Sequence, residues 1–171
     1  ERPAIVDART ELGHWEADTV VGQRKGKEAV VFTMVERITD HYIAIKISGR
    51  NSASVQQAMS QLHEEYGERF ARVFKTITAD NGPEFETFSE AEAWGTKVYF
   101  AHPYSSWERP RNERHNGMLR DYIPKGKSIE QYTDEDILSF ADALNSRPRR
   151  VLGYHTPEEL FDNFLDSVYA N

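Results

Sequence analysis

The sequence contains no cysteine, which excludes disulfides and thiolate metal sites. Its six histidines are scattered rather than paired at zinc-like spacing, so carboxylates are the main ligands available for any metal ion. Oxygen donors of this kind suit Mg²⁺ or Mn²⁺. Any metal chemistry in this chain is therefore expected to depend on Asp and Glu.

Long apolar runs and a net positive charge are also missing. No hydrophobic stretch approaches the length of a membrane-spanning helix, and the first residues lack the basic and apolar segments of a secretory signal. We therefore expect a cytoplasmic protein that does not enter a membrane. The net charge of −7 argues against a protein that coats nucleic acid through an overall basic field.

Positive charge is nevertheless concentrated locally. Between Trp107 and Lys127 the basic residues outnumber the acidic ones by three, and a second basic cluster follows at Arg147-Pro148-Arg149-Arg150. Such clusters are either solvated faces or contacts to an anionic partner. The charge pattern alone leaves both interpretations open.

The first two thirds of the chain alternate between predicted strands and helices. The length of 171 residues is that of one domain. Runs rich in Val, Ile, Thr and aromatic residues predict an antiparallel meander over Trp15–Val21, Ala29–Val35 and Tyr42–Ile47. After it we expect a helix capped by Asn51 or Ser52, a strand over Val73–Thr78, a short helix from Pro83 and a strand over Val98–Ala101.

The last third of the chain is predicted to be helical. Thr133 and Thr156 each begin a capping-box pattern ahead of an apolar stripe, the second with Pro157 at the first helical position. The earlier order of strand, helix, strand implies parallel pairing through crossover helices, so the sheet is mixed. This pattern predicts an α/β protein with a ribonuclease-H-like fold, a mixed five-stranded sheet flanked by helices.

Three acids occupy unusual positions in these predicted elements. Asp18 interrupts an apolar strand, Asp80 ends a strand at the turn sequence Asp-Asn-Gly-Pro, and Glu113 lies on a predicted polar helix. Taken singly, each has an ordinary explanation as a solvent-facing acid, a turn residue or a surface residue. Together they can converge at one edge of a mixed sheet, where divalent cations would neutralise their mutual repulsion and support phosphoryl transfer.

The motifs around these acids resemble those of a known family. His-Trp-Glu-Ala-Asp ending at Asp18, Asp-Asn-Gly-Pro-Glu-Phe from Asp80 and Asn-Glu-Arg-His-Asn-Gly around Glu113 resemble the DDE triad of retroviral-integrase-like transposases. The match is closest to the insertion-sequence-thirty family, and Leu144–Phe161 also resembles the sequence after the catalytic core in these enzymes. The resemblance implies a metal-dependent transposase domain that cleaves DNA at transposon ends and joins a 3′-hydroxyl to target DNA.

The resemblance also implies roles for particular residues. Asp18, Asp80 and Glu113 would be catalytic and would hold two Mg²⁺ or Mn²⁺ ions. Contacts to DNA are expected from amide and basic side chains, namely Asn81, Asn112, Arg114, Asn116, Arg120, Lys125 and Lys127. The Asn side chains would orient phosphates or the carboxylates, or else cap helices and turns, and the basic ones would meet the DNA backbone or face solvent.

The expected partners are the transposon ends, the target DNA and further copies of the chain in the active assembly, near the nucleoid of a bacterial cell. No helix-turn-helix is recognisable, so we expect residues 1–171 to form a single catalytic core, about 10–165, without the domain that recognises transposon ends.

The identity of the third acid is less certain from spacing than that of the other two. Asp80 and Glu113 are 33 positions apart, slightly closer than in the retroviral enzymes, so Glu108 is a rival. We prefer Glu113, because Asn116-Gly117 follows it as in the family. Two neighbouring residues are expected to have ordinary roles: His115 on the surface, and Glu84 at a helix N-terminus rather than on a metal ion.

Three other functions remain open from the sequence. A ribonuclease-H-like nuclease would hydrolyse nucleic acid without joining strands. A metal-independent glycosidase would keep its paired acids active in the presence of a chelator. A catalytically inactive DNA-binding module would have no need of all three acids.

Overall fold

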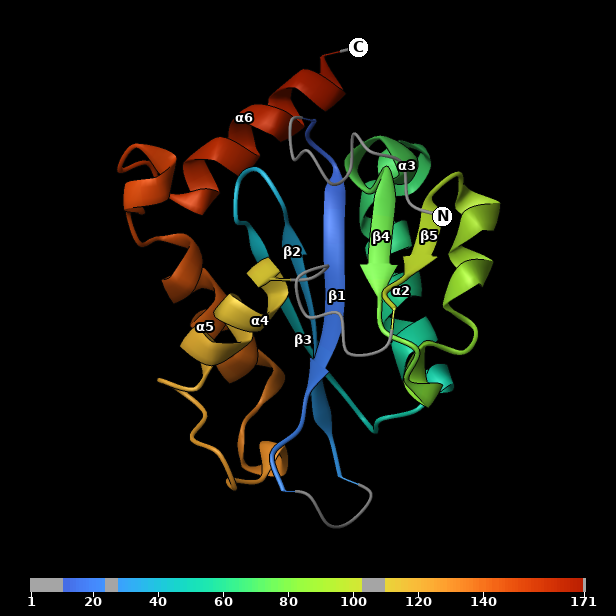
Figure 1. Ribbon diagram of the computed structural model, residues 1–171, viewed down its shortest axis with the longest axis vertical. Coiled ribbons are helices and arrows are strands. Elements are labelled where there is room, and N and C mark those ends of the chain that lie inside the picture. Colours follow the sequence, from blue (N-terminus) through green and yellow to red (C-terminus); the bar gives the residue numbers. More distant parts are fainter. Residues whose placement is uncertain (1–10, 24–27, 103–109, 171) are drawn as a thin grey trace.

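The computed structural model describes residues 11–23, 28–102 and 110–170 of the chain. They form one five-stranded sheet in the order β3-β2-β1-β4-β5 (Figure 1). Strand β2 pairs antiparallel with both β1 and β3, whereas β4 pairs parallel with both β1 and β5. The predicted mixed sheet is therefore confirmed. The strands span His14–Val20 (β1), Val30–Glu36 (β2), Tyr42–Ile47 (β3), Thr76–Ala79 (β4) and Lys97–Phe100 (β5).

The helices begin where the sequence supplies caps. The Asn51 side chain accepts a hydrogen bond from the Ser54 amide at the start of α2, and Thr133 and Thr156 form the predicted capping boxes of α5 and α6. The α-helices are Ser52–Tyr66 (α2), Phe70–Val73 (α3), Pro110–Leu119 (α4), Asp134–Asn145 (α5) and Pro157–Tyr169 (α6). The 3-10 helices are Gly67–Arg69 (η1), Pro83–Phe85 (η2), Phe88–Trp94 (η3), Ile129–Gln131 (η5) and Arg150–Leu152 (η6).

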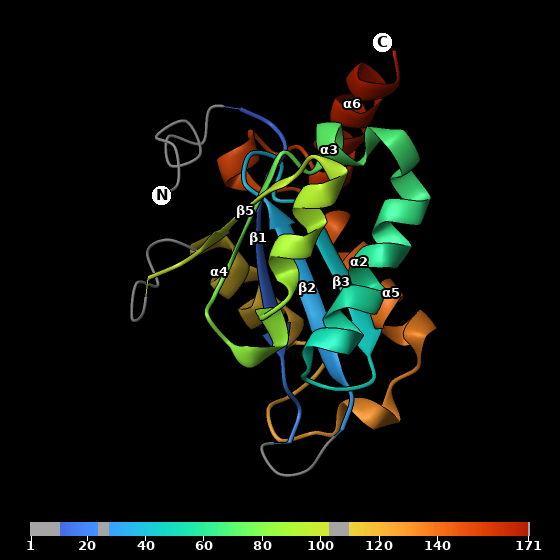
Figure 2. The same ribbon diagram turned by 90° about the vertical axis from the view of Figure 1, so that its right-hand side faces the viewer.

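The sheet separates two apolar layers. Alternate residues of β2 point to opposite faces, so Phe32 and Met34 pack with α2, α3 and α6, whereas Val31 and Val35 pack with α4 and α5. Figure 2 shows the sheet nearly edge-on, with α2 on one face and α4 on the other. No helix in the described ranges is both long and apolar enough to cross a membrane.

Two predicted boundaries differ from the structure. The strand expected over Val73–Thr78 starts only at Thr76, because Val73 ends α3 and packs with Phe70 in the core. The short helix expected from Pro83 consists of η2 and η3 instead. Both differences arise where buried aromatic side chains, and not local propensity, decide the backbone geometry.

The C-terminal helix α6 docks beside the β2–β3 turn through an aromatic contact. The His41 ring stacks on Phe161 with ring centroids 3.9 Å apart, and Phe161 also meets Trp15 edge-on. Burial in this contact lowers the pKa of His41 to about 3. The imidazole is therefore neutral when α6 is docked.

We predict that replacing His41→Phe reduces the acid sensitivity of the fold. Between the folded pKa of about 3 and the ordinary value of 6.5, the unfolded chain binds more protons at this residue, so stability falls as the pH falls below about 6.5. Through this one site the folding equilibrium constant changes by up to about tenfold per pH unit. Urea unfolding at about pH 7.5 and about pH 5 should show a smaller drop for the variant than for the wild type.

The exposed His155 provides a matched control, because its substitution by Phe should leave the pH dependence of the wild type unchanged. Equal drops in stability for the wild type and His41→Phe would contradict the assignment of this proton to His41.

Candidate active site

Asp18 lies in the second half of β1, and Asp80 directly follows its parallel neighbour β4. The β1–β4 register pairs His14 with Thr76 and Glu16 with Thr78. Continued by two residues, the same register sets Asp18 opposite Asp80, which directly follows β4. The edge beyond the carboxyl ends of such strands is where open α/β sheets place their sites.

The helix α4 is fixed above β1 by Glu16, a carboxylate that is fully buried. Its Oε1 accepts a hydrogen bond from the Asn112 backbone N–H at 2.9 Å, and the Asn112 side-chain amide donates to the Glu16 carbonyl at 3.0 Å. The first N–H groups of a helix have no partner within the helix and favour a negative charge. Glu16 therefore caps α4 from another element.

A second set of charged contacts supports this attachment. The other Glu16 oxygen forms an ion pair with the buried Arg37 Nε at 3.0 Å. Arg111, in the first turn of α4, pairs with Asp40, a buried residue of the β2–β3 turn with a φ of 60°. The start of α4 is thus tied to β1 and to the turn after β2.

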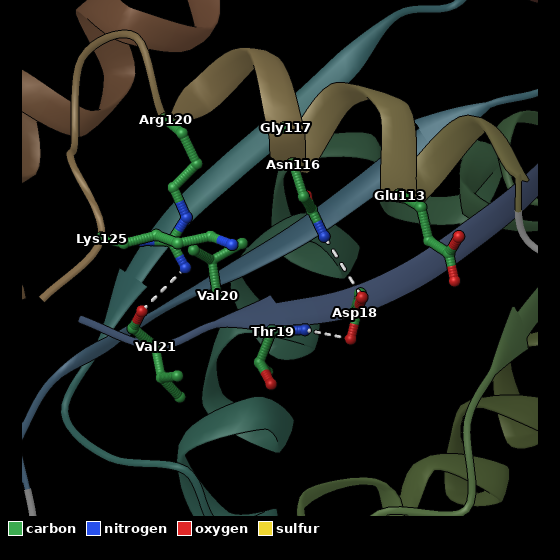
Figure 3. A pocket seen from close by; sticks show the side chains of 9 residues that line it. All are labelled: Asp18, Thr19, Val20, Val21, Glu113, Asn116, Gly117, Arg120 and Lys125. Carbon is green, nitrogen blue, oxygen red and sulfur yellow. Dashed lines mark hydrogen bonds between the residues drawn. The ribbon is translucent and has the colours of Figure 1, made fainter. Parts of the chain in front are cut away.

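The attachment of α4 creates a pocket of about 290 Å³ that Asp18 and Glu113 share. Its lining runs along the end of β1 and the exposed side of α4 and includes Asp18, Thr19, Val20, Val21, Glu113, Asn116, Gly117, Arg120 and Lys125. Figure 3 shows the Glu113 carboxylate directed down from α4 on the side of Asp18, while Arg120 and Lys125 lie at the other end, near Val21.

The Asp18 carboxylate is oriented by two hydrogen bonds. Its Oδ1 accepts from the Thr19 backbone N–H at 2.8 Å, and its Oδ2 accepts from the Asn116 side-chain amide at 3.2 Å. Both bonds appear in Figure 3. The side chain is only partly buried, so it is held in one direction while it borders the pocket.

Asp80 is held in a tight turn that depends on glycine. Its Oδ1 accepts a hydrogen bond from the Gly82 N–H at 2.7 Å. A Cβ atom at Gly82 would lie 2.8 Å from that same oxygen and 2.3 Å from Glu84 Oε1, so no larger residue fits without movement. Glu84 is buried and pairs with Arg50 Nε at 2.7 Å, at the start of η2.

The predicted site residues fall into two groups. The pocket brings together Asp18, Glu113, Asn116, Arg120 and Lys125. The remaining predicted residues lie outside its lining, namely Asp80, Asn81, Asn112, Arg114 and Lys127. Among the described residues, no three His, Asp or Glu side chains form a cluster that could hold a metal ion.

Two residues of α4 lie where the sequence analysis did not expect them. Asn112 was predicted to contact DNA, but it is fully buried, because its amide is used in attaching α4 to Glu16. His115 was expected on the surface and is also fully buried, with Nδ1 against the Arg111 carbonyl and Nε2 against Arg149. Burial lowers the pKa of His115. The rival acid Glu108 lies outside the described residues.

Several residues that shape the site carried only weak sequence signals. Glu16 lies two residues before Asp18 on the same face of β1, a spacing that could have drawn attention to it. Tyr42 and Asn145 gave no such signal, because their contacts join segments far apart in the chain. Arg149 appeared only as part of a basic cluster, but it donates to the Leu144 carbonyl and faces His115.

The chain is similar to known proteins over most of its length. Residues 8–106 match the model of the integrase core domain. The chain is 40% identical over 162 residues to a probable transposase for the insertion-like sequence element IS1161 of Streptococcus salivarius, covering 95% of this chain and 45% of that protein. It is 36% identical over 163 residues to the transposase InsI for insertion sequence element IS30A of Escherichia coli, covering 95% and 41%.

A solved structure shows the same fold. The catalytic core domain of BIV integrase superposes with a TM-score of 0.64 at 22% sequence identity, covering 92% of this chain and 97% of that one. The predicted ribonuclease-H-like fold is confirmed by this likeness. The chain spans less than half the length of the two transposases compared above.

We predict that Glu16→Gln strongly destabilises the protein while Glu113→Gln does not. Removing the Glu16 charge leaves the buried Arg37 without its carboxylate, a change that typically costs about 3–5 kcal/mol. Glu113 is exposed, so its neutral variant should stay within about 0.5 kcal/mol of the wild type. Urea unfolding followed by tryptophan fluorescence, to which the buried Trp15 contributes, measures both. Equal stability of the two variants would show that Glu16 does not anchor α4.

Proposed function

This chain belongs to the integrase core domain family, and we propose that it is the catalytic core of a DNA transposase. In this proposal it cleaves DNA at the ends of a mobile element and joins the resulting 3′-hydroxyl to target DNA. The observation that carries the proposal is the shared pocket of Asp18 and Glu113 at the carboxyl end of β1, with Asp80 following the adjacent strand. The named relatives are transposases, which supports this function over other ribonuclease-H-like chemistry.

The carboxylates at this edge have the chemistry that divalent metal ions prefer, although among the described residues they are not gathered into a cluster that could hold one. Enzymes of this family generally use such ions, and Asp18, Asp80 and Glu113 offer the carboxylate oxygens that Mg²⁺ and Mn²⁺ prefer. We propose that these three residues hold two ions. Bound there, the ions would activate the attacking oxygen and stabilise the leaving oxygen of a phosphoryl transfer.

The protein's own residues would prepare these carboxylates. Asn116 and the Thr19 N–H hold the two oxygens of Asp18 in fixed directions, and the Gly82 N–H holds one oxygen of Asp80. Side chains fixed in this way lose little further freedom when substrate arrives, which lowers the barrier to reaction. Glu113 is exposed on the first turn of α4, where it can approach a phosphate from the side opposite the sheet.

The basic end of the pocket would receive the DNA backbone. Arg120 Nη2 donates to the Val21 carbonyl at 3.0 Å, which fixes the guanidinium while leaving further N–H donors. Lys125 is exposed beside it. Arg114, Lys127 and Asn81 are exposed outside the pocket and would contact more distant phosphates. Such contacts position DNA without reading its sequence.

The proposed partners are the element's end sequences and target DNA. Recognition of the ends would require residues beyond this chain, because phosphate contacts alone do not specify a sequence. We further propose that several copies act together on the two ends and that the reaction takes place in the bacterial cytoplasm, as expected for proteins related to bacterial transposases.

We predict that Asp18→Asn, Asp80→Asn and Glu113→Gln each reduce strand joining by at least about a hundredfold, because each removes a charged ligand. The assay follows a labelled duplex with a free 3′-hydroxyl as it joins plasmid DNA in Mg²⁺, using the whole protein that carries this chain. Asp162→Asn, on the exposed side of α6, is the matched control and should be fully active.

Wild-type activity in any of the three variants, or in excess EDTA, would contradict the assignment. Cleavage without any joining by the wild type would favour a nuclease instead.

We predict that Lys125→Ala weakens DNA binding equally for element-end and scrambled duplexes. Each lost phosphate contact should reduce the slope of log affinity against log salt by roughly one unit. Arg120→Ala should do the same, and Lys97→Ala, which removes an exposed charge from β5, should not. Titrations of labelled duplexes at several salt concentrations measure the slopes. Unchanged slopes for Lys125→Ala and Arg120→Ala would place both residues on a solvated face.

A further inference from the structure

A chain of hydrogen bonds runs from α5 through β3 and α4 to the Asp18 carboxylate of β1. The Asn145 side chain accepts from the Tyr42 N–H and donates to the Tyr42 carbonyl, both at 2.9 Å. The Tyr42 hydroxyl donates to Asn116 Oδ1 at 3.0 Å, and Asn116 Nδ2 donates to Asp18 Oδ2 at 3.2 Å. Four elements, α5, β3, α4 and β1, are thus connected through side-chain amides and one phenol.

The direction of each bond in this chain of hydrogen bonds is determined by its neighbours. Asn112 Nδ2 donates to the Glu16 carbonyl, so Asn112 presents its Oδ1 to Asn116. An amide oxygen only accepts, and the Asp18 carboxylate also accepts, so Asn116 must direct its NH₂ group toward both. The Asn116 oxygen then faces Tyr42, whose hydroxyl has to be the donor.

Tyr42 is held rigidly enough to act as that donor. Its side chain is 1% exposed, its backbone is clamped by Asn145, and its ring stacks against His115 with centroids 5.6 Å apart. His115 is itself fixed by Arg149 and the Arg111 carbonyl. Burial raises the pKa of Tyr42 far above its ordinary value, so the hydroxyl keeps its proton at neutral pH.

We propose that Tyr42 is a positioning residue for the reaction, which fixes the Asn116 amide and through it the direction of the Asp18 carboxylate. The inference rests on the proposed function, because it assigns Tyr42 a part in preparing a catalytic acid. Tyr42 is not among the residues that line the pocket. Its hydroxyl contacts Asn116, which does line the pocket.

Removal of the Tyr42 hydroxyl would leave the Asn116 oxygen facing a hydrocarbon ring. A buried acceptor without a donor is costly, and Asn116 is only partly buried, so its amide would turn toward water. Asp18 would then keep the Thr19 N–H but lose the bond to its second oxygen. Groups that orient a metal-ligating side chain by a hydrogen bond typically contribute about 10–100-fold to metal affinity or activity.

The test is Tyr42→Phe, which keeps the ring and its packing. Nuclear magnetic resonance of the ¹⁵N-labelled chain should show a shifted Asn116 side-chain amide with faster proton exchange. Titration with Mn²⁺ alone, followed by electron paramagnetic resonance, should show about tenfold weaker binding. In the whole transposase, kcat for strand joining should fall by a similar factor while KM for DNA stays unchanged.

Tyr132→Phe is the matched control. Its hydroxyl donates to the Tyr122 carbonyl at 3.4 Å within the same apolar layer and, among the described residues, forms no contact with Asn116 or Asp18, so the same chemical change should leave Mn²⁺ affinity and joining as in the wild type. Asn116→Ala provides a second variant that breaks the chain of hydrogen bonds at its next residue. If Tyr42 acts through Asn116, the double variant Tyr42→Phe/Asn116→Ala should be no weaker in Mn²⁺ binding than Asn116→Ala alone.

Several results would overturn the inference. They are an unchanged Asn116 amide in Tyr42→Phe, wild-type Mn²⁺ affinity in that variant, or additive losses in the double variant. Absence of Mn²⁺ binding and of strand joining in the wild type would instead reject the proposed function. The Asn116 amide signals would then still decide whether Tyr42 orients Asn116.

Discussion

The buried carboxylate of Glu16 is the interaction on which the site depends. It accepts from the first turn of α4 and pairs with Arg37, so one charge both caps a helix and neutralises a buried cation. Because the capped residue lies 96 positions later in the chain, this contact sets the height of α4 above β1. Asp18, two residues along the same face, and Glu113, next to the capped residue, then border one pocket.

Local chemistry made much of this fold predictable. Capping boxes at Thr133 and Thr156, the Asn51 cap and the three meander strands are encoded within a few residues each, and they appear as expected. The inward positions of α4 were harder to predict, because its polar side chains do not all face water. Asn112 is buried against a polar partner from β1, and His115 against one from the α5–α6 connection. Sequence periodicity cannot show either contact.

The basic clusters show a related limit of sequence reasoning. Charge counts treat Arg147, Arg149 and Arg150 alike, but the structure uses them differently. Arg147 donates to the Tyr122 hydroxyl, Arg149 donates to the Leu144 carbonyl, and Arg150 is exposed. Guanidinium groups bound in this way stabilise the packing of α4 and α5. Only a partner's position in space, and not the density of charge along the chain, separates these roles.

The parallel pairing of β1 with β4 has a consequence for the order in which the protein folds. Connections of nine and five residues separate the strands of the β1–β2–β3 meander, whereas His14 meets Thr76, which lies 62 residues later. Local pairings form before pairings that must close long loops. The smaller loop-closure cost therefore favours formation of the meander that carries Asp18 before the pairing that brings Asp80 beside it. The three acids thus come together only through pairings and helix docking that join distant parts of the chain.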